Sequence, residues 1–88
     1  MLTVWKFSVP ADKDLFAVAM PAGARLLAVQ VQTGVPCVWA AVDPKAQVVG
    51  RRFRWAGTGH PVLEADRYVG TIQLYGGALV FHLFDLGE

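Results

Sequence analysis

The stretch that decides the fold is Ile72-Gln73-Leu74-Tyr75-Gly76-Gly77-Ala78-Leu79-Val80-Phe81, in which two apolar runs flank a pair of glycines. Glycine adopts positive φ without steric cost, and the turns that match the twist of a hairpin need positive φ. We therefore expect residues 72–75 to pair antiparallel with residues 78–81. Thr33-Gly34 has the same chemistry between two further apolar runs, so a second hairpin is predicted there.

Short apolar runs separated by proline and glycine make up the rest of the chain, and none of them keeps a helical period. The pattern predicts an all-β, mainly antiparallel fold, either a small barrel or a sandwich. Seven strands are expected, over residues 2–9, 15–20, 25–33, 36–43, 48–56, 67–75 and 78–84. At most one short helical turn is expected, near residues 61–66, because Pro61 suits a first turn and Glu64 favours the positive end of a helix dipole.

The composition indicates one domain over residues 1–88 with a surplus of apolar side chains. Hydrophobic residues make up 55% of the chain and charged residues 17%. So short a chain buries a smaller share of its surface than a typical domain does, and exposed apolar patches usually mark interfaces. A homo-oligomer is therefore predicted.

The formal net charge of +1 argues against binding to duplex nucleic acid or to an anionic membrane surface. The longest uncharged apolar run is too short to span a bilayer, and the first residues lack the pattern of an export signal. The single Cys37 excludes an intrachain disulfide and a multi-cysteine zinc site. We expect a soluble intracellular protein without a metal or cofactor.

Residues 51–56, Arg-Arg-Phe-Arg-Trp-Ala, form the main candidate for a binding strand. Strand alternation places Arg52 and Arg54 on one face, and Arg51, Phe53 and Trp55 on the other. Guanidinium groups donate paired hydrogen bonds to phosphate, and the Trp55 indole offers a surface on which a base can stack. The alternative interpretation is an edge strand protected by its charges.

The turn that follows this strand, Gly57-Thr58-Gly59-His60, is a candidate anion cradle. Two glycines allow successive N–H groups to point the same way, while Thr58 adds a hydroxyl and His60 a ring nitrogen. An ordinary turn is the alternative. The complete set of predicted ligand-binding residues is Arg52, Arg54, Trp55, Gly57, Thr58, Gly59 and His60.

The two histidines are the only candidates for acid–base chemistry at neutral pH. Alternation places His82 with Val80 and Phe84, which favours a core or interface position over a catalytic one. The carboxylates show no spacing that is typical of a metal site. No catalytic residue is assigned, and a hydrolase that uses His60 remains the third hypothesis.

Seven motifs along the chain form one pattern, and Trp5-Lys6-Phe7 opens it. They are Met20-Pro21-x-Gly23-Ala24-x-Leu26, Val29-x-Val31-Gln32, Pro36-Cys37-x-Trp39-Ala40, Val42-Asp43, Gly57-Thr58-Gly59-His60, Tyr68-Val69-Gly70-Thr71-x-Gln73 and Val80-Phe81-His82-Leu83-Phe84. Through them nearly the whole chain resembles a family of small, uncharacterised phage and prophage proteins. The resemblance implies a protein that acts in the cytoplasm of an infected bacterium, where it adjusts host physiology or blunts host defence.

The leading hypothesis is a homo-oligomer that sequesters a small anionic ligand without altering it, with sites near subunit boundaries. By analogy of context with phage sponges, the ligand is a nucleotide immune signal of the cyclic or ADP-ribose type. The alternative is a protein-binding inhibitor or host-takeover factor that docks onto a bacterial enzyme by β-augmentation.

Overall fold

The hairpin predicted at Gly76-Gly77 is present in the computed structural model, which describes residues 1–88. Strand β6 (Arg67–Leu74) pairs antiparallel with β7 (Leu79–Gly87), with Leu74 opposite Leu79. Gly76 and Gly77 have φ angles of 66° and 94°, which confirms the need for glycine. Between the strands, Tyr75–Gly77 forms a 3-10 turn, η1, so the connection is longer than a two-residue turn.

This 3-10 turn is the only helical segment of the chain. The prediction placed the helical turn near residues 61–66, and that placement is wrong. Residues 61–66 form an irregular loop that ends in a turn closed by the Asp66 N–H and the Leu63 carbonyl at 3.0 Å. The glycine turn before this loop consequently does not lie at a helix N-terminus.

The second predicted hairpin joins β3 (Arg25–Gln32) to β4 (Val35–Val42). Thr33 and Gly34 form its two-residue turn, with φ angles of 51° and 80°. Positive φ at both central positions is what a twisted hairpin of this length requires.

The remaining strands complete two antiparallel sheets. Strand β1 (Thr3–Ser8) joins the first sheet, whose order is β1-β4-β3. Strands β2 (Leu15–Pro21) and β5 (Val48–Gly57) join the second sheet, whose order is β2-β5-β7-β6. The seven observed strands coincide with the seven predicted ones to within a few residues at their ends, and the all-β prediction is confirmed.

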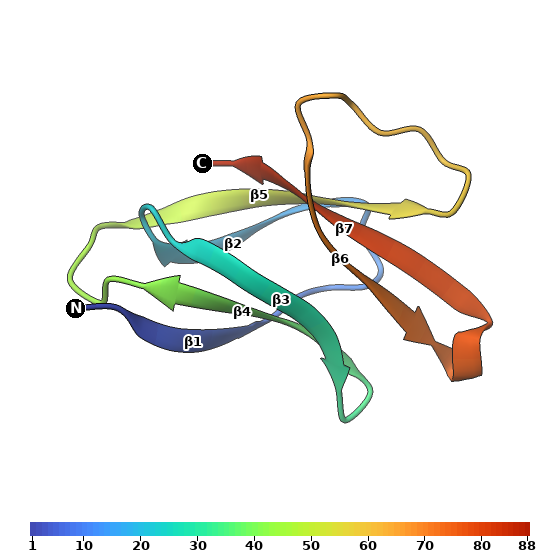
Figure 1. Cartoon of the computed structure of the whole chain (residues 1–88), viewed down its shortest axis with the longest axis horizontal. Helices are drawn as coiled ribbons and strands as arrows, with labels where there is room; N and C mark the ends of the chain where they lie inside the picture. The colour runs from blue at the N-terminus through green and yellow to red at the C-terminus, as the bar shows by residue number, and fades with distance from the viewer.

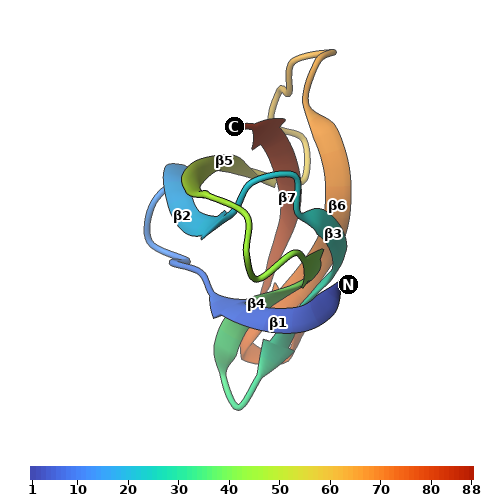
Figure 2. The same cartoon turned by 90° about the vertical axis from the view of Figure 1, so that its left-hand side faces the viewer.

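The two sheets form a sandwich and not a closed barrel (Figure 1). Strands β3 and β6 contact each other along one side of the sandwich. On the opposite side β2 and β1 are both edge strands, and Figure 2 shows them with no strand between them. The barrel therefore stays open between β1 and β2.

The core lies between the two sheets and follows the alternation of the strands. Its most deeply buried side chains come from β2, β4, β5 and β7, and include Met20, Val38, Val42, Phe53 and Leu83. Cys37 is buried and makes no disulfide. The outward-facing residues of the four-stranded sheet are the ones that carry the candidate site.

Candidate functional site

Strand β5 sorts its arginines onto two faces as the alternation predicted. Arg51, Phe53 and Trp55 are buried between the sheets. Arg52 is exposed and Arg54 is half-buried on the outer face of the four-stranded sheet. The predicted pair of guanidinium groups therefore does share one surface of the molecule.

Arg52 and Arg54 line a groove of about 370 Å³ on this outer face. Leu15 and Ala17 of β2 form one wall of the groove, and Leu86 of β7 contributes to the other. Arg52 Nη2 donates to the Leu86 carbonyl at 3.0 Å, and its remaining donors have no protein partner. No carboxylate lines this groove, so two cations face a small and mainly apolar hollow.

Arg54 also contacts the loop that follows β5, through an ion pair with Asp66. Its Nε lies 3.2 Å from Asp66 Oδ2, and the Asp66 side chain is only 3% exposed. The contact is ionic and lacks the direction of a hydrogen bond, because Arg54 Nε has no hydrogen-bond partner. The two terminal nitrogens of Arg54 make no hydrogen bond with the protein. Asp66 therefore offsets part of the charge of Arg54 and leaves those nitrogens for a ligand.

The glycine turn lies outside the arginine groove. The His60 N–H donates to the Gly57 carbonyl at 3.0 Å, so one of the predicted cradle amides is already used. The His60 ring packs on Gly57, where an added Cβ would lie 3.0 Å from Cε1 and Nδ1 of that ring. None of the turn residues Gly57, Thr58, Gly59 and His60 lines a cavity, so the turn and the arginine pair do not form one site.

The Thr58 hydroxyl belongs to a hydrogen-bonded chain that the sequence interpretation missed. Thr58 Oγ1 lies 2.8 Å from His82 Nε2, and His82 Nδ1 lies 2.9 Å from Thr71 Oγ1. Thr71 Oγ1 in turn contacts the Tyr68 hydroxyl at 2.5 Å. His82 is thus satisfied by two hydroxyls on the outer face and lies outside the core, which was one of the two positions predicted for it; the interface position stays a prediction.

The sequence did contain a signal for the hydrogen bond between Thr71 and His82. The Gly76-Gly77 hairpin fixes the register of β6 against β7, and that register places Thr71 directly opposite His82. Side chains directly opposite each other on antiparallel strands are close enough to interact. Extending the predicted pairing by one residue would have brought the hydroxyl to the imidazole.

Trp55 cannot serve as the predicted stacking surface. It is 5% exposed, and its Nε1 donates to the Pro10 carbonyl at 2.7 Å. Its ring packs inside the sandwich against Phe16 and Phe81. Trp55 therefore holds the connection between β1 and β2 onto the core, and the groove has no exposed indole.

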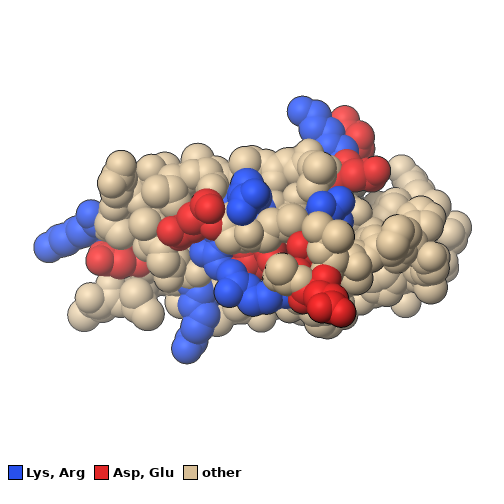
Figure 3. Space-filling model, turned by 90° about the horizontal axis from the view of Figure 1, so that it is seen from above, with Lys and Arg blue, Asp and Glu red and all other residues tan.

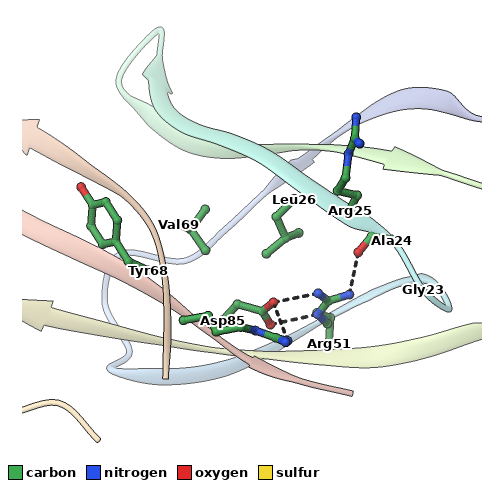
Figure 4. Close-up of a pocket in the computed structure, with 9 residues that line it drawn as sticks. Gly23, Ala24, Arg25, Leu26, Arg51, Tyr68, Val69 and Asp85 are labelled. Carbon is green, nitrogen blue, oxygen red and sulfur yellow. Dashed lines mark hydrogen bonds and ion pairs between the residues drawn. The ribbon is translucent and has the colours of Figure 1, made fainter. Parts of the chain in front are cut away.

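A second charged cluster lies on the inner side of β5 (Figure 4). Arg51 Nε and Nη2 donate to the two Asp85 carboxylate oxygens at 2.9 and 2.7 Å, and Nη1 donates to the Ala24 carbonyl at 2.9 Å. Arg67 Nη2 reaches Asp85 Oδ2 at 3.2 Å. These residues border a cavity of about 430 Å³ that Arg25 also lines, although Figure 4 shows the Arg25 side chain pointing away from the ion pair.

The electrostatics of this cluster are balanced internally. Burial alone raises the pKa of the Asp85 carboxyl, but hydrogen bonds from Arg51 and the Gly87 amide, with the charges of Arg51 and Arg67, outweigh burial and lower the pKa overall. The hydrogen bond from Arg51 to Asp85 raises the pKa of the guanidinium more than its desolvation lowers it. The cluster therefore joins β5 to β7 as a buried ion pair.

Charges of both signs alternate on the face of the molecule that is seen from above in Figure 3. Basic side chains there lie beside acidic ones, and one end of the face carries neither. No broad basic surface is formed on this face. No three side chains among His, Cys, Asp and Glu come close enough to share a metal ion. The structure also contains no helix with the length and apolar character needed to cross a membrane.

The fold and the groove together define a small antiparallel β-sandwich with an arginine pair on the outer face of its larger sheet. The chain belongs to the family described as domain of unknown function DUF7352, whose model matches residues 1–88. Searches of the curated proteins and of the solved structures give no match.

Proposed function

We propose that this protein binds a small anionic ligand in the groove formed by β2, β5 and β7, and releases it unchanged. The observation that carries the proposal is that Arg52 and Arg54 line one hollow of about 370 Å³ without any carboxylate among its lining residues. Guanidinium groups with free donors are the side chains best suited to bind phosphate or carboxylate groups.

The arginine groove is a better candidate than the cavity beside Arg51. In that cavity Asp85 occupies three of the donors of Arg51 and Arg67, so an anion would have to compete with a buried carboxylate. In the groove, Arg52 gives up one donor to a backbone carbonyl, which carries no full charge. An incoming anion therefore gains more at Arg52 than at Arg51.

The ligand class we propose is a phosphate-bearing nucleotide. The groove combines cations with the apolar side chains of Leu15 and Leu86, which suit a phosphate and the face of a base or sugar respectively. With the resemblance to phage proteins, the role we propose is sequestration of a nucleotide immune signal in the cytoplasm of an infected bacterium. Trp55 and the glycine turn have no part in this site.

The proposal is tested with Arg52→Gln in isothermal calorimetry and thermal-shift assays. The probes are ADP-ribose, cyclic dinucleotides and inorganic pyrophosphate. Loss of a charged hydrogen-bond donor should weaken binding about tenfold or more. Arg25→Gln is the matched control, because Arg25 is an exposed strand arginine that does not line this groove, and it should bind as the wild type does.

Equal weakening by both substitutions would mean that the arginines act only through net charge. No response to any probe would contradict the proposed ligand class. Binding followed by recovery of a changed molecule would indicate catalysis, and Thr58 and His82 would then be the residues to replace, since their side chains are hydrogen-bonded and His60 makes no side-chain hydrogen bond.

A further inference from the structure

The free edge of β2 is unusual for an exposed strand. Strand order places β2 at the edge of the four-stranded sheet, and its seven residues include no charged side chain. Edge strands are normally protected from pairing by lysine, by bulges or by an inward-pointing charge. The other free edge, β1, contains Lys6. Of the two edges that flank the open side, only β2 therefore lacks a charged side chain, and its one protecting residue is Pro21 at the end of the strand.

The backbone groups that this edge offers follow from two hydrogen bonds. The Trp55 N–H donates to the Asp14 carbonyl at 2.8 Å, and the Ala22 N–H donates to the Gln47 carbonyl at 2.7 Å. In an antiparallel pair, alternate residues direct their backbone groups toward the same neighbour. The backbone N–H and C=O groups of the even-numbered residues of β2 thus point toward β5. Those of the odd-numbered residues point to the free edge, and these residues are Leu15, Ala17, Ala19 and Pro21.

Proline lies at the end of this edge, where it leaves no unpaired donor. The N–H groups that remain unpaired are those of Leu15, Ala17 and Ala19. If a second β2 lies antiparallel with the two-fold axis at Ala17, Leu15 faces the partner's Ala19 and all of these donors find carbonyl acceptors. The edge is therefore self-complementary in its hydrogen bonds.

The side chains are self-complementary as well. In this register Phe16 lies opposite the partner's Val18 on the inner faces of the two sheets, and both residues are only half-buried in a single copy. On the outer face Ala17 meets the partner's Ala17, so nothing bulky or charged separates the strands. Apolar pairs directly opposite each other are the stabilising unit of antiparallel sheets.

We infer that two copies of this chain associate through β2, which joins their four-stranded sheets into one continuous sheet. This inference extends the proposed function and rests on it for the role of the dimer in ligand binding. The pairing of the two β2 strands is tested without any ligand. Leu15 and Ala17 form one wall of the arginine groove, so the partner's β2 would lie directly behind this wall and extend it. The partner would thereby enlarge the wall of each site.

The axis also relates the two arginine pairs. Arg52 is the register partner of Ala17, so the two Arg52 residues would face each other across the axis. Three strand spacings would separate their Cα atoms, about 14 Å in total, and each side chain would turn from the Leu86 carbonyl of β7 toward the axis when a ligand binds between them. A ligand with two phosphate groups, such as a cyclic dinucleotide, suits this arrangement best.

Analytical ultracentrifugation of the full chain tests the association. The expected mass is twice the 9.6 kDa of one chain. Ala17→Pro removes one donor from each copy and should raise the dissociation constant of the dimer about thirtyfold. Ala17→Lys should act in the same direction, because two like charges would meet at the axis.

Both substitutions leave the fold of one copy intact on physical grounds, since the Ala17 N–H and side chain point to solvent; circular dichroism checks this. Val4→Lys is the control, because Val4 is exposed on the other edge strand, and it should remain dimeric. A wild-type monomer, or a dimer that only Val4→Lys dissociates, would overturn the inference.

The register is tested by cross-linking. In a hydrogen-bonded antiparallel pair the Cα atoms lie about 5.5 Å apart, within the range of a disulfide. Ala17→Cys should therefore form an intermolecular disulfide under mild oxidation, while Val4→Cys should not, and the native Cys37 is buried. Cross-linking of both variants at equal rates would overturn the β2 pairing.

The results for dimer and ligand separate the two proposals. A β2-paired dimer that binds none of the probes keeps the inference and removes the proposed ligand class. Ligand binding by a monomer keeps the proposed function and removes the inference. Pairing of β2 with a bacterial protein in place of a second copy would also overturn it and would favour the protein-binding alternative.

Discussion

At the scale of single residues, Arg51 and Asp85 stand out as the only buried charged residues of the sandwich, and they pair with each other. Both residues are almost fully buried, with 8% and 5% of their surface exposed. Every nitrogen of the Arg51 guanidinium has an acceptor, and each Asp85 oxygen accepts at least two hydrogen bonds. Removing one partner would leave the other charge buried without a counter-ion, and a buried ion pair is therefore costly to break.

We therefore expect Asp85→Ala to lower the free energy of unfolding by roughly 3 kcal/mol, toward the low end for buried pairs because the cluster borders a cavity open to solvent. Glu88→Ala is the matched control: Glu88 also approaches Arg51, at 3.7 Å, but from a more exposed position. Its effect should stay below about 1 kcal/mol. Urea denaturation measures both, and equal losses would show that the burial of Asp85 confers no special stability.

The same carboxyl makes stability depend on pH. The pKa of Asp85 in the folded protein lies below its ordinary value of 3.8, so the unfolded chain takes up this proton first as pH falls. The stability that Asp85 contributes is thus complete above the unfolded pKa and is lost as pH drops through the folded one.

The melting temperature of the wild type should approach that of Asp85→Asn as the pH is lowered from about 5 to about 2. Scanning calorimetry across this range measures the convergence. A constant difference between the two proteins would mean that the Asp85 charge does not stabilise the folded state.

At the scale of strands, the contact between β3 and β6 is what joins the two sheets on their closed side. Gly70 of β6 lies against Val29 of β3, and a Cβ at position 70 would stand 2.7 Å from Val29 Cγ1. This glycine is required by close approach and not by its φ angle. A register shift in β6 between Tyr68 and Gly70 accompanies the contact.

Gly70→Ala should consequently destabilise the protein by about 1–3 kcal/mol through overpacking. Gly50→Ala is the control, because a Cβ there meets Ala17 Cβ at an ordinary 3.9 Å. The double variant Gly70→Ala with Val29→Ala should lose less stability than the sum of the two single variants, since truncation of Val29 makes room for the added methyl group. Additive losses in denaturant unfolding would place the cause of the Gly70 effect elsewhere.

Strand β5 shows which features the alternation of side chains predicted and which it did not. Alternation correctly divided β5 into an inner face with Arg51, Phe53 and Trp55 and an outer face with Arg52 and Arg54. The same inner position that was predicted for Trp55 is incompatible with its predicted role as a stacking surface. Charge alone could not reveal that Asp66, twelve residues beyond Arg54, would return to pair with it.

At the scale of the whole molecule, the two sheets leave one side open and place β2 and the arginine groove together on it. The apolar surplus of the composition has a structural counterpart in this side, where Phe16 and Val18 remain half-buried. Association through β2 would cover these side chains and extend the wall of the groove in one step. The predicted oligomer and the predicted ligand site thus converge on one proposed surface.

By itself, the amino-acid sequence determined the number of strands, both glycine hairpins and the inward or outward direction of the β5 side chains. These depend on neighbouring residues, because turn conformation and two-residue alternation are local properties of the backbone. Only the tertiary structure decided that Arg51 meets Asp85, that Thr58 meets His82, and that the glycine turn stands outside the arginine groove. Those relations join residues far apart in the chain, and no local pattern specifies which strands lie side by side or where the barrel stays open.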